Sequence, residues 1–379
     1  MTTHEVTVRP RYWSVGKLLF WLIAVAGLVV VLMRLGLGIR AVSNMDNTFA
    51  WAYWNGVKLT AVALGAGAFT VCGAVHIFNL KQFKPLVRPA ILVGLLGYLT
   101  FIFILIMDLG RPERIWHMII YWNHSSVLFE VGICVMLYTT VLVLEFAPVV
   151  FERLGWERAI HRLHKIHLPL IILGVVLSTL HQSSLGSLFM VMSGKVHPLW
   201  HSNMLPLFYF NSAIAAGLSM VLVVASLNAA LYKQPLRLPL LASLAKALPW
   251  VLGLYLTLKF GELYLTGDLH YLMTGDTYSQ LFWGEMIGGA ALPMILLAIP
   301  AVRNRRAGIV VAGGLVLLAT LLNRFDVGLV GWMRPAGAFY FPSLPEIIMG
   351  VGIPVLAMLV YDLVARYLPL FADEGQSHS

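Results

Sequence analysis

The stretch DLGRPERIWHMIIYWNHSSVLFE, residues 108–130, joins two long apolar runs of the chain. It opens with a glycine and a proline that end the preceding helix, Gly110 and Pro112, among four charged residues: Asp108, Arg111, Glu113 and Arg114. Three amphipathic aromatic residues follow: Trp116, Tyr121 and Trp122. Because such side chains settle at the headgroup level of a bilayer, the stretch is expected where the chain leaves a membrane and re-enters it.

Glu130 lies a few residues inside the apolar run that follows this stretch. A carboxylate at the centre of a membrane helix costs about 2.5–3.5 kcal/mol on insertion scales, and less near the interface. Mutual pairing in a capped loop is the favoured interpretation of Glu113 and Arg114. Asp108, Arg111 and Glu130 are interpreted as functional, because other spans place polar groups at the same depth.

The composition is that of a polytopic membrane protein. Of 379 residues, 59% are hydrophobic and 11% are charged, whereas soluble domains carry about 25% charged residues. Runs of spanning length are predicted at residues 18–39, 53–78, 87–107, 127–147, 168–192, 204–231, 240–265, 281–299, 308–322 and 346–367. We therefore expect an all-α protein with about ten transmembrane helices, forming one integral membrane domain over residues 1–379.

A short echo indicates how these helices are grouped. Residues 126–130 read SVLFE, and residues 279–282 read SQLF with Glu285 close behind, four spans later. Two such openings from the same side fit a parallel repeat, and we expect two four-helix bundles plus two extra helices.

The distribution of lysine and arginine predicts the orientation. With the leader 1–17 inside, the loops on that side carry 17 of these residues and the opposite loops carry 7. The positive-inside rule then places both termini, including the tail 368–379, in the cytoplasm. The net charge of +9 is therefore sorted between loops and does not indicate nucleic-acid binding. In one cytoplasmic loop, residues 151–166, apolar residues recur among basic ones and predict a short helix lying on the membrane surface.

Polar groups gather at one depth. Seven ionisable residues from six spans are expected in the outer leaflet: Lys58, Asp108, Glu130, His181, Lys259, Glu262 and Glu285. Gln182 and Asn211 lie at similar depth, whereas the inner half holds only a few such residues. Individually, the two lysines could snorkel to the headgroups, Lys259 and Glu262 could simply pair on one helix face, and His181 could be a core histidine. Together the residues predict an outward-facing polar pocket.

The sequence offers few ligands for metal cofactors. Cys72 and Cys134 both fall inside apolar runs without the spacing of an iron–sulfur site. Haem b requires two axial histidines at similar depth on facing helices, and His76 and His181 are expected in opposite leaflets. We therefore expect no haem, no iron–sulfur cluster and no metal site in this chain.

The chain resembles the NrfD/polysulfide-reductase-type integral membrane subunits, and within them most nearly the HybB-type quinone-reactive subunit of periplasmic nickel–iron hydrogenases. The matching motifs are PLVRPA at 85–90, SVLFE at 126–130, LEFAP at 144–148, FERLGW at 151–156, HQSS at 181–184, GSL at 186–188, KVHPLW at 195–200, FGEL at 260–263 and YFP at 340–342. The DLGRP form at 108–112 looks more like the wider NrfD group, which leaves the identity of the catalytic partner open.

The resemblance implies ten helices, no haem and a quinone site near the periplasmic face. It also implies a periplasmic four-cluster iron–sulfur subunit, which passes on electrons from a catalytic subunit such as a nickel–iron hydrogenase or another respiratory oxidoreductase. Outer-loop aromatic residues are expected to form its docking surface: Trp116, Tyr121, Trp122, Trp200, Trp332, Phe339 and Tyr340.

The expected function is electron and proton transfer at menaquinone or ubiquinone, with the direction left open. Glu130 is expected to donate the proton, His181 to hydrogen-bond a quinone carbonyl, and Asp108 with Arg111 to frame the mouth. Gln182, Asn211, Glu262 and Glu285 complete the expected quinone pocket. Two alternatives are a proton- or ion-coupled secondary transporter, for which broken helices at the bilayer midplane would be typical, and a structural anchor without chemistry.

Overall fold

The structure is a computed structural model that describes residues 15–49, 51, 53–192, 194–333 and 340–371. Ten helices in these residues are long and apolar enough to cross a membrane, and no strand is formed there. The first six are α1 (Val15–Leu37), α2 (Tyr53–Ile77), α3 (Val87–Asp108), α5 (Val127–Leu154), α6 (Glu157–Met190) and α7 (Leu205–Leu231). The seventh is α8 with α9 (Leu238–Ala245, Ala247–Thr266), and the eighth is α10, the π-helix η5 and α11 (Thr277–Trp283, Gly284–Ala291, Leu292–Ala298). The last two are α13 (Arg306–Phe325) with the π-helix η6 (Asp326–Val330), and α14 (Leu344–Tyr367). The prediction of an all-α protein with ten spans is confirmed.

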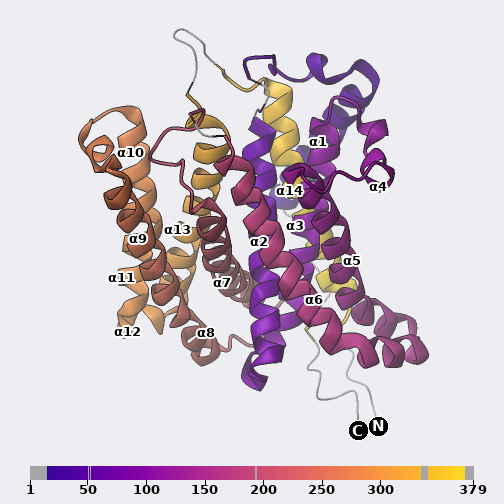
Figure 1. Ribbon diagram of the computed structural model, residues 1–379. Coiled ribbons are helices and arrows are strands. Elements are labelled where there is room, and N and C mark those ends of the chain that lie inside the picture. Colours follow the sequence, from indigo (N-terminus) through magenta and orange to yellow (C-terminus); the bar gives the residue numbers. More distant parts are fainter. Residues whose placement is uncertain (1–14, 50, 52, 193, 334–339, 372–379) are drawn as a thin grey trace, which may run out of the picture.

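The helices form two bundles and a flanking pair (Figure 1). The first bundle is α2, α3, α5 and α6; the second is α7, α8–α9, α10–α11 and α13. Helices α1 and α14 pack on each other and against α3. In Figure 1 the short helix α4 (His117–Ile120) lies at the upper end, and α8 and α12 (Pro300–Arg303) lie at the lower end. We call these ends the α4 side and the α8 side.

The two bundles meet where α2 crosses α7 at glycines. A Cβ atom added to Gly67 would lie 1.9 Å from the carbonyl oxygen of Ala213, and one added to Gly217 would lie 2.0 Å from the backbone of Gly67. Small residues at a crossing let membrane helices approach closely, where packing and not water exclusion holds them together. The crossing therefore holds the two bundles in contact at the backbone level.

Residues 108–130 form the α4 side of the first bundle. Helix α3 ends at Asp108, and the buried guanidinium of Arg34 caps it by donating to the carbonyl oxygens of Met107 (2.7 Å) and Leu109 (2.5 Å). The short helices η3 (Pro112–Arg114) and α4 follow, and α5 begins after Ser126, whose Oγ accepts from the backbone N–H of Phe129 at 3.4 Å. The stretch thus connects two spans, as predicted.

Helix α14 begins with a capping box that also ties down the chain after α1. Ser343 Oγ accepts from the N–H of Glu346, and the Glu346 carboxylate accepts from the N–H of Ser343 at 2.6 Å. The same buried carboxylate accepts from Ser43 Oγ (2.6 Å) and from the Tyr340 hydroxyl (2.8 Å). One carboxylate therefore satisfies donors from both ends of the chain.

Two expectations about helix boundaries are wrong. The loop 151–166 was predicted as a separate surface helix, but residues 157–166 are the first turns of α6. This helix is 34 residues long and includes Pro169 in its interior. The ninth span was predicted to end at residue 322, yet α13 and η6 continue it to Val330. In both cases polar residues were taken as a helix end, although they are accommodated at the surface or inside the protein.

Candidate functional site

The first bundle holds a buried histidine among aromatic rings. His181 on α6 is fully buried, and its ring lies 5.5 Å from that of Tyr98 and 5.8 Å from that of Phe101, both on α3. Tyr98 in turn meets Tyr138 of α5 edge-on at 4.5 Å. Together with Gln182 we call these residues the His181 cluster. Three helices of one bundle therefore converge on the predicted histidine.

The His181 cluster is rich in polar atoms without partners. Both ring nitrogens of His181, the hydroxyls of Tyr98 and Tyr138, and Oε1 of Gln182 are buried and have no hydrogen-bond partner within the described residues. Only the Gln182 amide nitrogen is engaged, donating to the carbonyl oxygen of Val62 at 3.3 Å. Since buried polar groups are almost always satisfied by protein, water or ligand, the cluster fits a bound molecule that both donates and accepts hydrogen bonds.

An ion pair lies at the α4-side end of the same bundle. Lys58 of α2 donates to Oδ2 of Asp108, and the two side chains are 8% and 13% exposed. Asp108 Oδ1 is buried without a partner in the part of the chain that the structure describes. Lys58 therefore pairs with Asp108 and does not follow the alternative of snorkelling to the headgroups, because the carboxylate at the end of α3 lies within its reach.

Glu130 and Arg111 are more open than the other candidates. Glu130 is in the first turn of α5 with an exposed side chain, and its Oε1 accepts from Ser184 Oγ at 2.5 Å. Ser184 follows His181 by three residues on α6, so this hydrogen bond places Glu130 next to the helix that carries the histidine. Arg111 is exposed in the loop between α3 and η3.

The second bundle encloses a separate charged network. Glu285, in the π-helix η5, accepts from Trp200 Nε1 at 3.1 Å and from the side-chain amide of Asn323. Arg324 donates to Asn323 Oδ1 at 2.6 Å, and its guanidinium lies 3.9 Å from the centre of the Tyr209 ring. Arg324 is 1% exposed and Trp200 is 2% exposed. A cavity of about 30 Å³ adjoins Glu285 and Asn323.

The remaining predicted residues also belong to this bundle. Lys259 Nζ lies 3.8 Å from Oε2 of Glu262, so these two pair on one face of α9. The same ammonium lies over the ring of Phe208 at 5.1 Å. Asn211 of α7 is buried, and its Oδ1 has no partner among the described residues. Lys259 is therefore a buried cation between a carboxylate and an aromatic face.

The structure distributes the predicted residues over two bundles and not around one pocket. The first group is Lys58, Asp108, Glu130, His181 and Gln182, and the second is Asn211, Lys259, Glu262 and Glu285. Within the described part of the chain, no hydrogen bond or ion pair joins the groups. Residues that the sequence predicts at the same membrane depth can belong to helices of different bundles, because the sequence alone does not show which helices face each other.

Some buried polar residues carry no signal in the sequence pattern. Tyr98 and Tyr138 each carry a single hydroxyl and lie within apolar runs, so the sequence does not distinguish them from ordinary core residues. Arg324 follows directly after the ninth apolar run and was counted as a loop residue, although it is buried. On the α8 side, His167 Nδ1 lies 3.3 Å from the buried carboxylate of Glu145, and its ring meets that of His76 at 4.9 Å.

The expected docking aromatics fall into two classes. Trp116, Tyr121 and Trp122 are 49%, 68% and 62% exposed on the α4 side. Trp200 is buried, as is Tyr340, so the expectation that they present a surface is wrong. Trp332 is half-buried, and Phe339 lies outside the described residues. Trp200 and Tyr340 are turned inward because each binds a buried carboxylate, Glu285 and Glu346 respectively.

The loop between α6 and α7 is fixed by His197. The backbone N–H of His197 donates to the carbonyl oxygen of Gly331 at 2.6 Å. Its ring stacks on that of Tyr278 with the centroids 4.6 Å apart, and its Nδ1 accepts from the backbone N–H of Leu199. Burial lowers the pKa of His197, and the charges of Asp276 and Asp268 oppose this shift only in part. The neutral imidazole is therefore the form that suits this loop.

Comparison with known proteins places these residues in a family context. Residues 41–336 match the family described as "Polysulphide reductase, NrfD". A protein of Nitratidesulfovibrio vulgaris (strain Hildenborough) is 39% identical over 370 residues, which cover 94% of this chain and 95% of that protein. The "Probable Ni/Fe-hydrogenase 2 b-type cytochrome subunit" of Escherichia coli (strain K12) is 34% identical, covering 95% and 93%. The "Menaquinone reductase, integral membrane subunit" of the same N. vulgaris strain is 28% identical, covering 96% and 94%.

Proposed function

The chain belongs to the NrfD (polysulphide reductase) family, and on that premise we propose that it is the haem-free, quinone-reactive membrane subunit of a respiratory oxidoreductase complex. A partner iron–sulfur subunit on the α4 side exchanges electrons with the quinone, and residues of the first bundle bind the quinone and move its protons. The names of two relatives, a hydrogenase subunit and a menaquinone reductase subunit, support this class.

The observation that carries the proposal is the set of unpaired polar atoms in the His181 cluster. A quinone head has two carbonyl oxygens that accept hydrogen bonds, and a quinol has two hydroxyls that donate them. His181 and the hydroxyls of Tyr98 and Tyr138 offer both donors and acceptors in an otherwise apolar setting. The residues present therefore fit this group, with His181 and Gln182 as the contacts to the oxygens.

Proton exchange is assigned to the carboxylates at the α4-side end of the bundle. Reducing a quinone consumes two electrons and two protons. Glu130 is exposed enough to exchange a proton with its surroundings, and its hydrogen bond to Ser184 holds it beside α6. Asp108 is fixed by Lys58 and shapes the mouth, with Arg111 in the adjoining loop.

The test compares three variants in the assembled complex. Glu130→Gln keeps an acceptor for Ser184 but cannot exchange a proton, so quinone-linked turnover should fall at least about tenfold, a loss of about 1.4 kcal/mol in transition-state stabilisation. Ser184→Ala is the matched control, because it removes the hydrogen bond and leaves the carboxylate. His181→Phe should weaken quinone binding. An artificial acceptor that takes electrons before the quinone should be reduced at the normal rate in all three.

Normal quinone turnover in Glu130→Gln would assign the proton to Asp108 or to the second bundle. A stoichiometric b-type absorption spectrum of the purified subunit would contradict the haem-free part of the proposal, and His76 and His181 would then be the ligands to test.

The partner is proposed to dock on the exposed aromatic surface of the α4 side, formed by Trp116, Tyr121 and Trp122. Aromatic residues are enriched in interface cores. In the proposed orientation the α8 side faces the cytoplasm and the α4 side faces the periplasm of a bacterial inner membrane, which the excess of lysine and arginine in the loops of the α8 side supports. Crosslinks from residue 121 to the iron–sulfur subunit should form in the intact complex. Crosslinks from residues 303–306 instead would contradict this orientation.

A further inference from the structure

Helix α6 is longer than a membrane span requires. It has 34 residues and is therefore about 50 Å long at 1.5 Å per residue, whereas the hydrocarbon core of a bilayer is about 30 Å thick. The apolar part of α6 begins at Leu168, so residues 157–167 stand at the level of the head groups on the α8 side. In Figure 1 these turns lie beside the end of α5 at the lower right, away from the second bundle.

A tight turn fixes these turns of α6 against α5. Gly155 adopts the left-handed conformation (φ 71°), and the backbone N–H of Trp156 donates to the carbonyl oxygen of Phe151 at 3.0 Å. The rings of Phe151 and Trp156 lie 5.4 Å apart, and Trp156 is 56% exposed. Tryptophan is enriched at membrane–water interfaces, so its position fits a hairpin tip at the headgroup level.

Three cations share one face of this part of α6 and have no partner. Arg158, Arg162 and Lys165 are spaced by four and three residues, which places them in one row along the helix. All three are exposed, and within the described chain none of them makes a hydrogen bond or an ion pair. None of the residues three or four positions away from them is acidic. On the adjoining end of α5, both carboxylate oxygens of Glu152 bind Arg88.

Like charges at this spacing destabilise a helix by a few tenths of a kcal/mol per pair. The row is therefore unfavourable unless a negative charge from outside the chain meets it. We call Arg158, Arg162 and Lys165 the cationic row.

The face that carries the cationic row continues into the lipid-facing surface of the span. Ile172, Val176 and Leu180 lie within about 40° of Arg158 around the helix axis, at 100° per residue. They are 48%, 49% and 45% exposed in the apolar part of α6. Lys165 precedes Ile172 by about 10 Å along the axis. A lipid whose acyl chain lies along this face therefore has its phosphate beside the cationic row.

We propose that this face of α6 binds an anionic phospholipid, with the phosphate at Arg162 and Lys165 and an acyl chain along Ile172 and Val176. Basic clusters next to a membrane span attract anionic lipids by about 1 kcal/mol per cation. A soluble acidic partner fits less well, because the cationic row leads directly into a surface that meets lipid. The site is independent of the proposed quinone chemistry.

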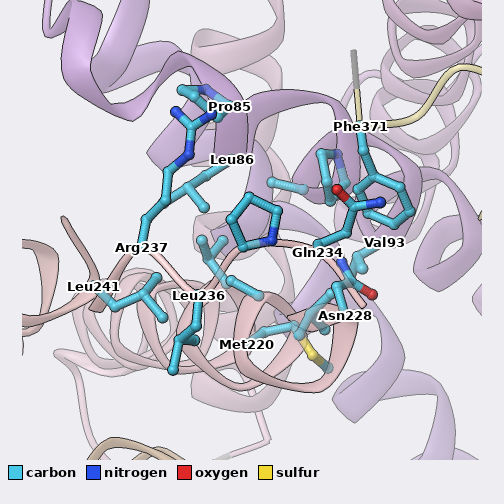
Figure 2. A pocket seen from close by; sticks show the side chains of 16 residues that line it. Pro85, Leu86, Val93, Met220, Asn228, Gln234, Leu236, Arg237, Leu241 and Phe371 are labelled. Atoms are coloured by element: carbon cyan, nitrogen blue, oxygen red, sulfur yellow. The ribbon is translucent and has the colours of Figure 1, made fainter. Parts of the chain in front are cut away.

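A cavity of about 80 Å³ is another place on the α8 side where an acyl chain could lie. Figure 2 shows it between the two bundles, bordered by Pro85, Val93 and Met220, with Phe371 at its edge. It has no lining residue from α6, so it is separate from the cationic row. A variant that fills this cavity therefore distinguishes the two places. Val224 lines it on α7 and is half-buried, so Val224→Phe is suitable.

The experiment measures lipid binding to the full-length chain in detergent by native mass spectrometry. The probe is dioleoylphosphatidylglycerol, compared with dioleoylphosphatidylcholine, which has the same chains and no net charge. Phosphatidylglycerol should bind at least about fivefold more tightly. Arg162→Gln should weaken it about fivefold, which corresponds to about 1 kcal/mol for one cation near an anionic surface. Arg162→Lys should retain most of the affinity, because the charge is kept.

Two matched variants should leave the binding of phosphatidylglycerol unchanged. Arg305→Gln removes an exposed arginine on the α8 side of the second bundle, between α12 and α13. Val224→Phe fills the cavity, and thermal unfolding in lipid-free detergent checks that this variant is folded. Glycerol phosphate should not compete, because it has no acyl chain to lie along α6.

Four results would overturn the proposal. Equal affinity of the unmodified chain for both lipids would show that charge does not select the ligand. A loss in Arg305→Gln equal to that in Arg162→Gln would show that the net charge of the chain acts and not the cationic row. Loss of the preference in folded Val224→Phe would assign the lipid to the cavity. Competition by glycerol phosphate would reduce the row to a site for any phosphate.

Discussion

The ion pair between Lys58 and Asp108 allows a quantitative test of how the first bundle is held together. Both side chains are largely buried, at 8% and 13% exposure. Removing one member of a buried pair leaves an uncompensated charge and costs about 3–5 kcal/mol, whereas replacing both by apolar residues is often neutral or stabilising. Lys58→Met should therefore lower the free energy of unfolding by about 3–5 kcal/mol.

A double-mutant cycle separates the pair from its surroundings. The double variant Lys58→Met/Asp108→Leu should recover most of the stability, so the coupling energy should be at least about 2 kcal/mol. Lys17 and Asp362 provide the matched control, because this ion pair is 31% and 27% exposed and Asp362 also binds Arg366 and Tyr232. Lys17→Met should cost less than about 1 kcal/mol.

The assay is unfolding of the full-length chain by sodium dodecyl sulfate in mixed micelles, followed by circular dichroism. A loss of less than about 1 kcal/mol for Lys58→Met, equal to that of the Lys17 control, would refute the reasoning and show that the pair is hydrated. An additive double variant would show the same, because independent sites do not couple.

Three further results are expected. Gly67→Ala should weaken the contact of the bundles at Gly217 and lower thermal stability sharply, whereas Gly314→Ala, with open space around its Cβ, should be neutral or slightly stabilising when the two are compared by thermal unfolding. Glu346→Ala leaves several buried donors unpaired and should cost at least about 3 kcal/mol in the same detergent unfolding assay. The folded state lowers the pKa of His197, so as the pH falls the unfolded loop binds the proton before the folded loop does. The stabilisation of this loop should therefore be fully present above about pH 6.5 and decline below it. Backbone amide hydrogens of the loop should accordingly exchange faster, relative to the intrinsic rate, at about pH 5.5 than at about pH 7.5. Unchanged exchange over this range would contradict the assignment of the neutral form.

The sequence by itself determined that this is a helical membrane protein, how many spans it has, and which polar residues are unusual for their depth in those spans. Apolar runs report spans directly, since a membrane helix must satisfy its own backbone and meet lipid with apolar side chains. The same argument singled out Glu130, His181, Lys259 and Glu285, because charged or polar side chains are costly at that depth. Pairing of Lys259 with Glu262 followed from their spacing on one helix.

Only the tertiary structure decided which of these residues meet. Depth in the membrane is encoded along one chain segment, but the rotation and neighbours of a helix depend on packing with all the others, as at the Gly67–Gly217 crossing. In the packed structure His181 lies in the first bundle near Tyr98 and Tyr138, whereas Glu285 lies in the second bundle. Trp200 and Arg324 are buried at positions where the sequence predicts loops. Trp200 donates a hydrogen bond to the buried carboxylate of Glu285 and Arg324 donates one to the amide oxygen of Asn323, so both satisfy polar groups inside the protein.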